Sequence, residues 1–365
     1  MGTRLKELRD AGVSIWLDDL SRARLRTGSL AELVAHSGVT GVTTNPTIFA
    51  AALARGEDYA AQLRELGDVL VDRAIKELCA ADVREACDLL QDVARSSKGY
   101  DGWVSIEVAP TLAHEVEGTV AEAVELRDLV GRDNVLVKIP ATDEGVLAVE
   151  EVIARGISVN VTLIFSVERY AQVMQAYVRG LERALRNGLS IRGIHSVASF
   201  FISRVDTEVD RRLSELGRSD LRGRTAIANA LLAYGAFEEF VASPRFRELL
   251  GRGANVQRPL WASTGTKDPA LPDTIYVGEL AGPGVVNTMP EKTLRAFAQR
   301  GEVGPSVAHR DGEGRALLDE VEAAGVDLRE VFDLLEVQGV EKFVASWGDL
   351  TTSVEQAMAS ERHRV

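Results

Sequence analysis

The stretch Asn134-Val-Leu-Val-Lys138-Ile-Pro-Ala-Thr142 is a short run of aliphatic residues with a single lysine near its end. Near-continuous apolar runs of this kind are typical of parallel strands that are covered on both faces. Alternation places Leu136 and Lys138 on one face. A buried ammonium is costly, so this lysine should lose its proton more easily than one in water, and a neutral amine can attack a carbonyl. For this segment alone, a salt-bridged lysine at a strand end is an equally good interpretation.

Similar runs recur along the chain and alternate with segments of helical periodicity. The expected strands are residues 13–18, 39–43, 103–107, 134–139, 157–161, 194–198, 258–262 and 284–287. The expected helices are residues 29–37, 58–97 (two helices), 111–130, 143–155, 167–187, 203–241 (two or more) and 290–299. Eight strand-helix repeats predict an α/β fold, either a closed (β/α)8 TIM barrel or an open doubly wound sheet. Neither a Gly-x-Gly-x-x-Gly motif after the first strand nor a P-loop is present, and the count of eight favours the barrel.

The chain is expected to form a single barrel domain over residues 1–365. Residues 315–359 are expected to be appended C-terminal helices that follow the glycine-rich loop Gly301–Gly314. A separate C-terminal domain is the alternative.

Several element boundaries have chemical signals. Ser29-Leu-Ala-Glu32 matches a capping box, and Gly38 is the expected end of that helix. Pro140 should close the strand that contains the lysine, and Thr142 should cap the helix that follows.

Composition excludes several classes of protein. The chain has 365 residues, of which 45% are hydrophobic and 27% are charged, as in a globular protein. The net charge of -13, without a basic stripe, argues against nucleic acid as a partner. No apolar stretch approaches the ~18 residues of a membrane span, and the N-terminus lacks the apolar core of a signal peptide. A cytoplasmic enzyme is therefore expected.

The two cysteines agree with a reducing compartment. Cys79 and Cys87 fall on one apolar stripe with helical spacing. Eight residues on one helix separate them by ~12 Å, which is too far for a disulfide. We expect both to be free core residues.

Polar residues stand at the carboxyl ends of the first five expected strands. They are Asp18 and Asp19, Thr43 and Asn45, Ser105 and Glu107, Lys138, and Asn160 and Thr162. In a barrel, the carboxyl ends of all strands meet at one mouth, where active sites lie. A lysine, carboxylates, amides and hydroxyls directed at one mouth are hard to explain by packing.

Each of these residues also has a simpler interpretation. Asp18 or Asp19 could cap the next helix, and Asn45 before a proline is a common turn residue. Glu107 could pair with a surface arginine, and Thr162 could be a helix cap. Only the convergence of these residues favours a catalytic site.

Four motifs at these strand ends resemble those of the transaldolase family and follow one another in the family's order. They are Val42–Ile48 (Thr-Asn-Pro), Val104–Val108 (the glutamate strand), Leu136–Pro140 (the lysine motif) and Gly156–Ser166 (Asn-x-Thr-Leu-x-Phe-Ser). The resemblance runs from about residue 13 to 300. The chain length and the segment Leu260–Lys267 resemble the larger transaldolase subfamily.

The resemblance implies four catalytic residues. Lys138 would form the Schiff base, and Asp18 would be the acid/base residue, with Asp19 standing where the family often has threonine. Glu107 and Thr162 would position a catalytic water.

The resemblance also implies the substrate-binding residues. Asn45, Asn160 and Ser199 would hold the dihydroxyacetone portion, and Arg204 and Ser263 would bind phosphate. The family's second phosphate-binding arginine is not at its expected place after Ser263. Lys267 is the nearest cation and a candidate replacement.

A transaldolase of the pentose phosphate pathway transfers dihydroxyacetone from sedoheptulose 7-phosphate or fructose 6-phosphate to glyceraldehyde 3-phosphate or erythrose 4-phosphate. The expected partners are therefore small sugar phosphates, without nucleic acid or membrane, and a homo-oligomer is neither indicated nor excluded. No cofactor or metal is implied, and the five histidines lack ligand spacing. The alternatives are a Schiff-base aldolase that releases its donor, a sugar-phosphate-sensing barrel, and a metal-dependent isomerase, which lacks a ligand cluster.

Overall fold

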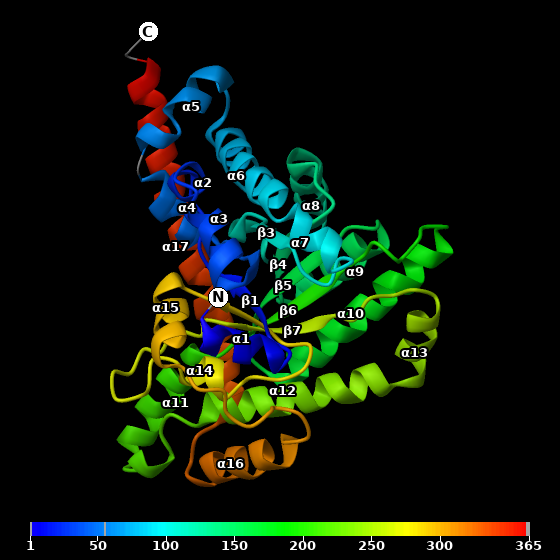
Figure 1. The fold of residues 1–365 in the computed structure, drawn as a ribbon, viewed down its shortest axis with the longest axis vertical. Helices are drawn as coiled ribbons and strands as arrows, with labels where there is room; N and C mark the ends of the chain where they lie inside the picture. Colours follow the sequence, from blue (N-terminus) through cyan, green and yellow to red (C-terminus); the bar gives the residue numbers. More distant parts are fainter. Residues whose placement is uncertain (1, 55, 363–365) are drawn as a thin grey trace.

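A computed structural model describes residues 2–54 and 56–362. Its centre is a closed barrel of eight parallel strands in sequential order (Figure 1). The strands are β1 (Ser14–Leu17), β2 (Val39–Val42), β3 (Trp103–Glu107), β4 (Val135–Pro140), β5 (Val159–Ile164), β6 (Ser196–Phe201), β7 (Arg258–Ala262) and β8 (Val286–Met289). Strand β8 pairs with β1 and closes the ring. The predicted (β/α)8 barrel is thus confirmed, and the open doubly wound alternative is wrong.

Helices surround the barrel. Those of the first half are α1 (Thr3–Asp10), α2 (Arg22–Arg26), α3 (Ser29–Glu32), η1 (Leu33–Ser37), α4 (Pro46–Leu53), η2 (Gly56–Asp58), α5 (Ala60–Leu66), α6 (Val71–Leu89), α7 (Gln91–Ser96), η3 (Pro110–Leu112), α8 (Val116–Val130), α9 (Asp143–Ala154) and α10 (Val167–Arg186). Those of the second half are α11 (Ser203–Glu215), η4 (Ser219–Leu221), α12 (Thr225–Ala242), α13 (Pro244–Gly251), α14 (Ile275–Gly278), α15 (Glu291–Arg300), α16 (Asp311–Ala323) and α17 (Leu328–Arg362).

All eight expected strands are present, but β5, β6 and β8 lie two or three residues later than expected. Ile157 and Ile194 are buried and apolar, which made them resemble strand residues. Their backbone nitrogens instead bond within turns, to Val152 and Ile191 respectively. Buried apolar residues thus precede the first residue of β5 and of β6. The hydrophobic pattern alone therefore places the start of these strands too early.

The helix pattern also differs in places. Helices α1, α2, α4, α13 and α14 lie outside the expected helix ranges, and residues 58–97 contain three α-helices (α5, α6 and α7) where two were expected. Both cysteines lie on α6, buried and free, as predicted.

One of the four predicted boundary signals is wrong. Gly28, with φ 75°, is the N-cap residue of α3, and Ser29 forms no capping bond. The Ser29 hydroxyl accepts a hydrogen bond from Arg24 instead, at 3.0 Å, so a tertiary contact replaces the capping box. Gly38 ends the following turn with φ 71°, and the Thr142 hydroxyl caps α9, both as predicted. Strand β4 ends at Pro140, also as predicted.

The barrel interior is filled below its mouth. Trp16 is fully buried, and a Cβ atom at Gly41 would lie 2.5 Å from its indole ring, so only glycine leaves room for the ring. Nearer the amino ends of the strands, Arg258 donates to the Ser14 hydroxyl at 2.6 Å. The Arg258 guanidinium lies 3.8 Å from the centroid of the Tyr100 ring. This packed floor fixes the strands whose carboxyl ends form the mouth.

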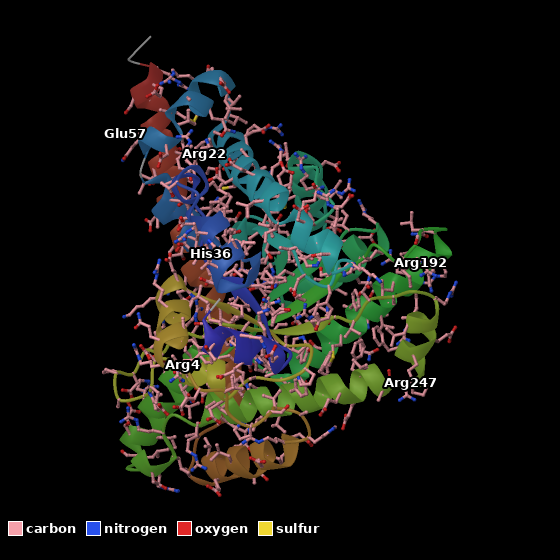
Figure 2. All side chains as sticks on the ribbon, in the orientation of Figure 1. Arg4, Arg22, His36, Glu57, Arg192 and Arg247 are labelled. Carbon is pink, nitrogen blue, oxygen red and sulfur yellow. The ribbon has the colours of Figure 1, made fainter. Side chains whose placement is uncertain are left out.

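The long helix α17 crosses the mouth of the barrel. It packs against α4, α5, α6, α11 and β5. In Figure 2, Arg192 and Arg247 lie on the right, on the opposite side of the molecule from α17. The mouth is therefore roofed by the last helix of the chain. In the described part of the chain, no helix combines the length and the apolar character needed to cross a membrane.

Candidate active site

A cavity of about 270 Å³ lies at the mouth of the barrel, beneath α17. Eight of the ten residues predicted from sequence line it: Asp18, Asn45, Lys138, Thr162, Ser199, Arg204, Ser263 and Lys267. The other two, Glu107 and Asn160, lie behind its wall, where they bond to Lys138 and Ser199 respectively. The structure therefore brings all ten together.

Strand register places the lysine between two polar residues. Lys138 on β4 is paired with Glu107 on β3 and with Asn160 on β5. The Lys138 ammonium nitrogen, Nζ, donates to Glu107 Oε2 at 3.0 Å and to the Thr44 carbonyl at 2.9 Å. The salt bridge allowed by the segment alone is thus present, but its partner is a buried carboxylate and not a surface residue. Burial raises the pKa of Glu107, and the charge of Lys138 opposes that rise.

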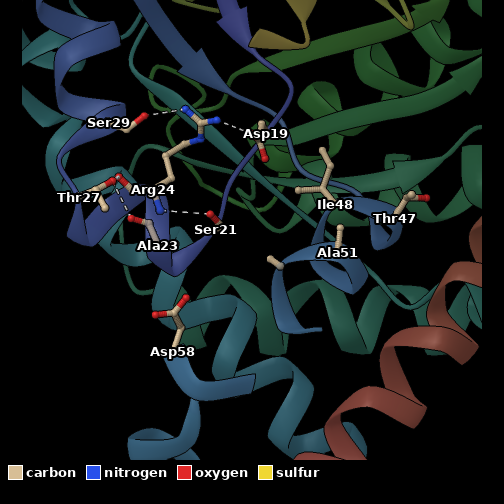
Figure 3. Close-up of a pocket in the computed structure, with 11 residues that line it drawn as sticks. Asp19, Ser21, Ala23, Arg24, Thr27, Ser29, Thr47, Ile48, Ala51 and Asp58 are labelled. Carbon is tan, nitrogen blue, oxygen red and sulfur yellow. Dashed lines mark hydrogen bonds and ion pairs between the residues drawn. The ribbon is translucent and has the colours of Figure 1, made fainter. Parts of the chain in front are cut away.

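The two neighbouring aspartates face different surroundings. Asp18 lines the cavity, and its Oδ1 accepts a hydrogen bond from the Thr43 hydroxyl at 2.7 Å. Burial raises the pKa of Asp18, opposed by the charge of Lys138 and by the Thr43 hydrogen bond. Asp19 forms a salt bridge with Arg24 at 2.6 Å (Figure 3). Asp18 is therefore the carboxyl group that belongs to the lysine site.

A second cavity, of about 570 Å³, adjoins the first and shares Thr47 and Ile48 with it (Figure 3). Among the described residues that line it, Arg24 is the one cation, and it also pairs with Glu291 at 2.7 Å. Two carboxylates thus neutralise this guanidinium. The second cavity is therefore less suited to an anion than the first.

A row of amide and hydroxyl groups lies beside the lysine. Asn160 donates from Nδ2 to the Ser105 hydroxyl at 3.0 Å and accepts from the Ser199 hydroxyl at 2.7 Å. These two bonds fix the orientation of the amide. Thr162 Oγ1 is buried and, within the described residues, has no hydrogen-bond partner. Asn45 caps α4 through Ile48 N at 3.0 Å and also lines the cavity, so its turn role and its place in the site coexist.

Two residues at the mouth have strained backbones. Leu163 and Ser263 have φ values of 60° and 56°, which is unfavourable for residues with a Cβ. Leu163 follows Thr162 and coincides with a register shift between β5 and β6. Backbone strain of this kind concentrates at functional sites. Ser263 lines the cavity, and Leu163 directly follows Thr162, which also lines it.

Three cations gather at one side of the cavity: Arg204, Lys267 and Lys342. Arg204 lies in the first turn of α11, 5.1 Å from the centroid of the Phe201 ring, and burial lowers its pKa. Lys342 comes from α17. Among the described residues, none of the three cations forms a salt bridge with a carboxylate, so this side of the cavity favours an anion.

The sequence interpretation missed several wall residues. Thr43 was expected at the mouth with Asn45, but no role in the site was assigned to it. Thr288 lies one residue beyond the predicted end of the last strand, and its hydroxyl is 2.6 Å from that of Thr43. Lys342 and Phe343 had no signal, because only the tertiary placement of α17 brings them to the cavity.

No group of three or more His, Cys, Asp or Glu residues within 2–54 and 56–362 is arranged to hold a metal ion. The fold and the site define a (β/α)8-barrel enzyme with a buried lysine close to two carboxyl groups, Glu107 and Asp18, at the strand ends. The chain belongs to the transaldolase/fructose-6-phosphate aldolase family, whose model matches residues 15–354. The family expected from the motifs is thereby confirmed.

Curated relatives agree over the full length of the chain. The transaldolase of Thermobifida fusca (strain YX) is 54% identical over 366 residues, covering 99% of this chain and 100% of its own. Transaldolase 1 of Streptomyces coelicolor is 55% identical, covering 98% of this chain and 95% of its own. The transaldolase of Saccharopolyspora erythraea is 54% identical, covering 98% of both chains.

One solved structure is described as a putative fructose-1,6-biphosphate aldolase from Coccidioides immitis. It is 11% identical and covers 98% of this chain and 92% of its own, with a TM-score of 0.26. That similarity is too low to bear on the function.

Proposed function

We propose that this protein is a transaldolase that moves a dihydroxyacetone unit from a ketose phosphate to an aldose phosphate through a Schiff base on Lys138. Family membership over nearly the whole chain and full-length relatives named transaldolase support the reaction. The observation that most supports the residue assignment is the buried Lys138 nitrogen, 3.0 Å from a buried glutamate, in a cavity with cations at one side. The substrates are sedoheptulose 7-phosphate or fructose 6-phosphate as donor, and glyceraldehyde 3-phosphate or erythrose 4-phosphate as acceptor.

The first step is formation of the imine. Lys138 passes a proton to Glu107, whose raised pKa suits it as an acceptor, and the neutral amine attacks the C2 carbonyl of the ketose. Loss of the C2 oxygen as water requires a proton donor. Glu107 and Thr162 serve this step through a bound water, since the Thr162 hydroxyl has no protein partner among the described residues.

The second step is cleavage of the C3–C4 bond. Asp18, as general base, takes the proton of the C4 hydroxyl, and the first aldose leaves. The bonding electrons enter the protonated imine, which becomes an enamine. Asn45, Asn160 and Ser199 hold the hydroxyl groups of the three-carbon fragment.

The last step is transfer. The enamine carbon attacks the aldehyde of the second aldose phosphate, while Asp18 returns its proton to the new hydroxyl. Hydrolysis of the imine then frees Lys138. Because the fragment stays covalently bound between two aldoses, ping-pong kinetics are expected. Arg204, Ser263 and Lys267 bind the substrate phosphate.

The test is reductive trapping. Wild-type protein treated with fructose 6-phosphate and borohydride should gain one reduced three- or six-carbon adduct on the Lys138 peptide, as located by mass spectrometry. Lys138→Met should gain none, although its other lysines remain. An adduct on another lysine, or on none, would overturn the assignment.

The alternative is an aldolase that releases dihydroxyacetone, because the family description includes fructose-6-phosphate aldolases. The two activities differ in the fate of the donor fragment. Transfer predicts little free dihydroxyacetone when an acceptor aldose phosphate is absent. Sustained release without an acceptor would favour the aldolase.

A further inference from the structure

The C-terminal helix α17 presents a basic residue to the active-site cavity that no sequence motif assigns. Lys342 lines the cavity together with Arg204 and Lys267. Burial lowers the pKa of the Lys342 ammonium, and the charges of Arg204 and Lys267 lower it further. Unbalanced repulsion between three cations is relieved by a multivalent anion.

Helix α17 is held against the mouth along one face. Four residues at helical spacing form that face: Glu336, Gly339, Phe343 and Ser346. Glu336 forms a salt bridge with Arg169 at 3.3 Å. The Ser346 and Thr47 hydroxyls are 2.8 Å apart. Contacts on both sides of Lys342 therefore fix the segment that carries it.

The middle of this face of α17 packs closely against the mouth of the barrel. A Cβ atom at Gly339 would lie 3.0 Å from the Leu163 side chain and 3.6 Å from the Arg204 guanidinium. Phe343 is 4% exposed, and its ring centroid lies 5.5 Å from Lys138 Nζ. Adjacent residues of α17 thus reach the two ends of the cavity, Phe343 at the lysine and Lys342 at the cations.

We propose that Lys342 is a phosphate-binding residue, so that α17 completes the phosphate subsite formed by Arg204, Ser263 and Lys267. This inference rests on the proposed function, because the anion is the phosphate of the sugar substrate. A sugar phosphate bound covalently to Lys138 would then extend beneath α17 from Phe343 to Lys342. An ammonium supplies three donors and a compact charge, which complements the planar guanidinium of Arg204.

The test compares a phosphorylated ligand with an unphosphorylated one. Lys342→Gln, Lys342→Arg and wild type are each assayed for the KM of fructose 6-phosphate, the inhibition constant of inorganic phosphate, and the concentration of dihydroxyacetone that half-saturates borohydride trapping. Lys6→Gln, on α1, removes the same charge from an exposed position and serves as the control.

For Lys342→Gln, the KM for fructose 6-phosphate and the inhibition constant of phosphate should both rise by roughly 10- to 100-fold. This fold-increase should be at least about ten times larger than any fold-change in the concentration of dihydroxyacetone that half-saturates trapping. Lys342→Arg should recover most of the loss, and Lys6→Gln should match wild type.

In Lys342→Gln, equal fold-changes in the constants for fructose 6-phosphate and for dihydroxyacetone would overturn the role of Lys342. No change in the constants for fructose 6-phosphate and inorganic phosphate would overturn it too. Those outcomes leave wild-type trapping intact, and the proposed function with it. Absence of trapping in the wild type would instead overturn the proposed function.

Discussion

Glu107 Oε2 lies 3.0 Å from Lys138 Nζ, and each side chain is only 5% exposed. A buried ion pair contributes little net stability, because desolvation offsets most of its Coulombic gain. In the mechanism we propose, its value is chemical, because one short proton transfer converts the Lys138 ammonium into a nucleophile. Glu107 is well placed for that exchange because burial raises its pKa.

Replacement of Glu107 by Gln should slow formation of the imine by about 10²- to 10⁴-fold, the usual contribution of one acid-base group. The amide cannot accept the lysine proton. The measurement is the single-turnover rate of borohydride-trappable adduct. Glu117→Gln, on the exposed surface of α8, is the control and should react normally. An unchanged trapping rate in Glu107→Gln would remove Glu107 from the mechanism.

The pH profile should report the same carboxyl groups. In the proposed mechanism Glu107 and Asp18 act as bases, so activity should require their ionised forms. Burial raises the pKa of both, and activity should therefore fall, as the pH decreases, at a higher pH than for a carboxyl of ordinary pKa near ~4. The profile of kcat/KM against pH checks this. An acidic limb at or below pH ~4 would contradict it.

Asp18→Ala should still form the adduct with Lys138, because in the proposed mechanism Asp18 acts only after the imine has formed, at C3–C4 cleavage and at transfer. Turnover should fall by about 10²- to 10⁴-fold. Asp19→Asn is the matched control, since Asp19 pairs with Arg24 in the neighbouring cavity, and it should retain near-normal turnover. Normal turnover in Asp18→Ala, with a loss in Asp19→Asn, would reverse the assignment.

Much of the site was predictable because strand geometry is regular. Side chains alternate along a strand, and parallel strands end at one mouth, so Asp18, Asn45, Glu107 and Lys138 could be brought together from their positions alone. The count of eight strands then predicted the closed barrel in which these strand ends meet. The motifs added Arg204 and Ser263, which lie after the strands and follow no alternation.

What could not be predicted depends on tertiary contacts. Ser29 has the sequence of a cap, but Arg24 captures its hydroxyl. The left-handed backbone at Leu163 shifts the β5–β6 register, and no propensity rule favours leucine there. Lys342 follows the last strand by more than 50 residues. Its place in the wall depends on how α17 packs across the mouth.

Two glycines of α17 provide a matched test of that packing. Gly348→Ala should raise the free energy of unfolding by about 0.5–1 kcal/mol, because the site is open and alanine favours helix. Gly339→Ala should lack this gain, since its Cβ would lie 3.0 Å from Leu163. Urea unfolding measures both. Equal stabilisation by the two variants would show that α17 does not pack closely on Leu163.

The buried carboxyl of Asp206, outside the lysine site, should make stability depend on pH. Asp206 is 2% exposed, and it accepts hydrogen bonds from Tyr276 at 2.6 Å and from Ala226 N at 2.7 Å. Burial raises its pKa from 3.8 to about 6, and those hydrogen bonds only partly oppose the rise. The favourable contribution of this carboxyl is therefore complete below pH ~4 and is lost as the pH rises through ~6.

Asp206→Asn removes this titration and keeps an oxygen acceptor, while the Tyr276 hydroxyl can turn to accept from the new amide. The free energy of unfolding of the variant, relative to wild type, should rise by about 2 kcal/mol between pH 4 and 7 and then level off. Urea unfolding at several pH values measures the difference. Asp349→Asn, an exposed change on α17, should give a nearly flat difference. If the Asp206→Asn and wild-type curves ran parallel across this range, the Asp206 carboxyl would not titrate differently in the folded and unfolded states.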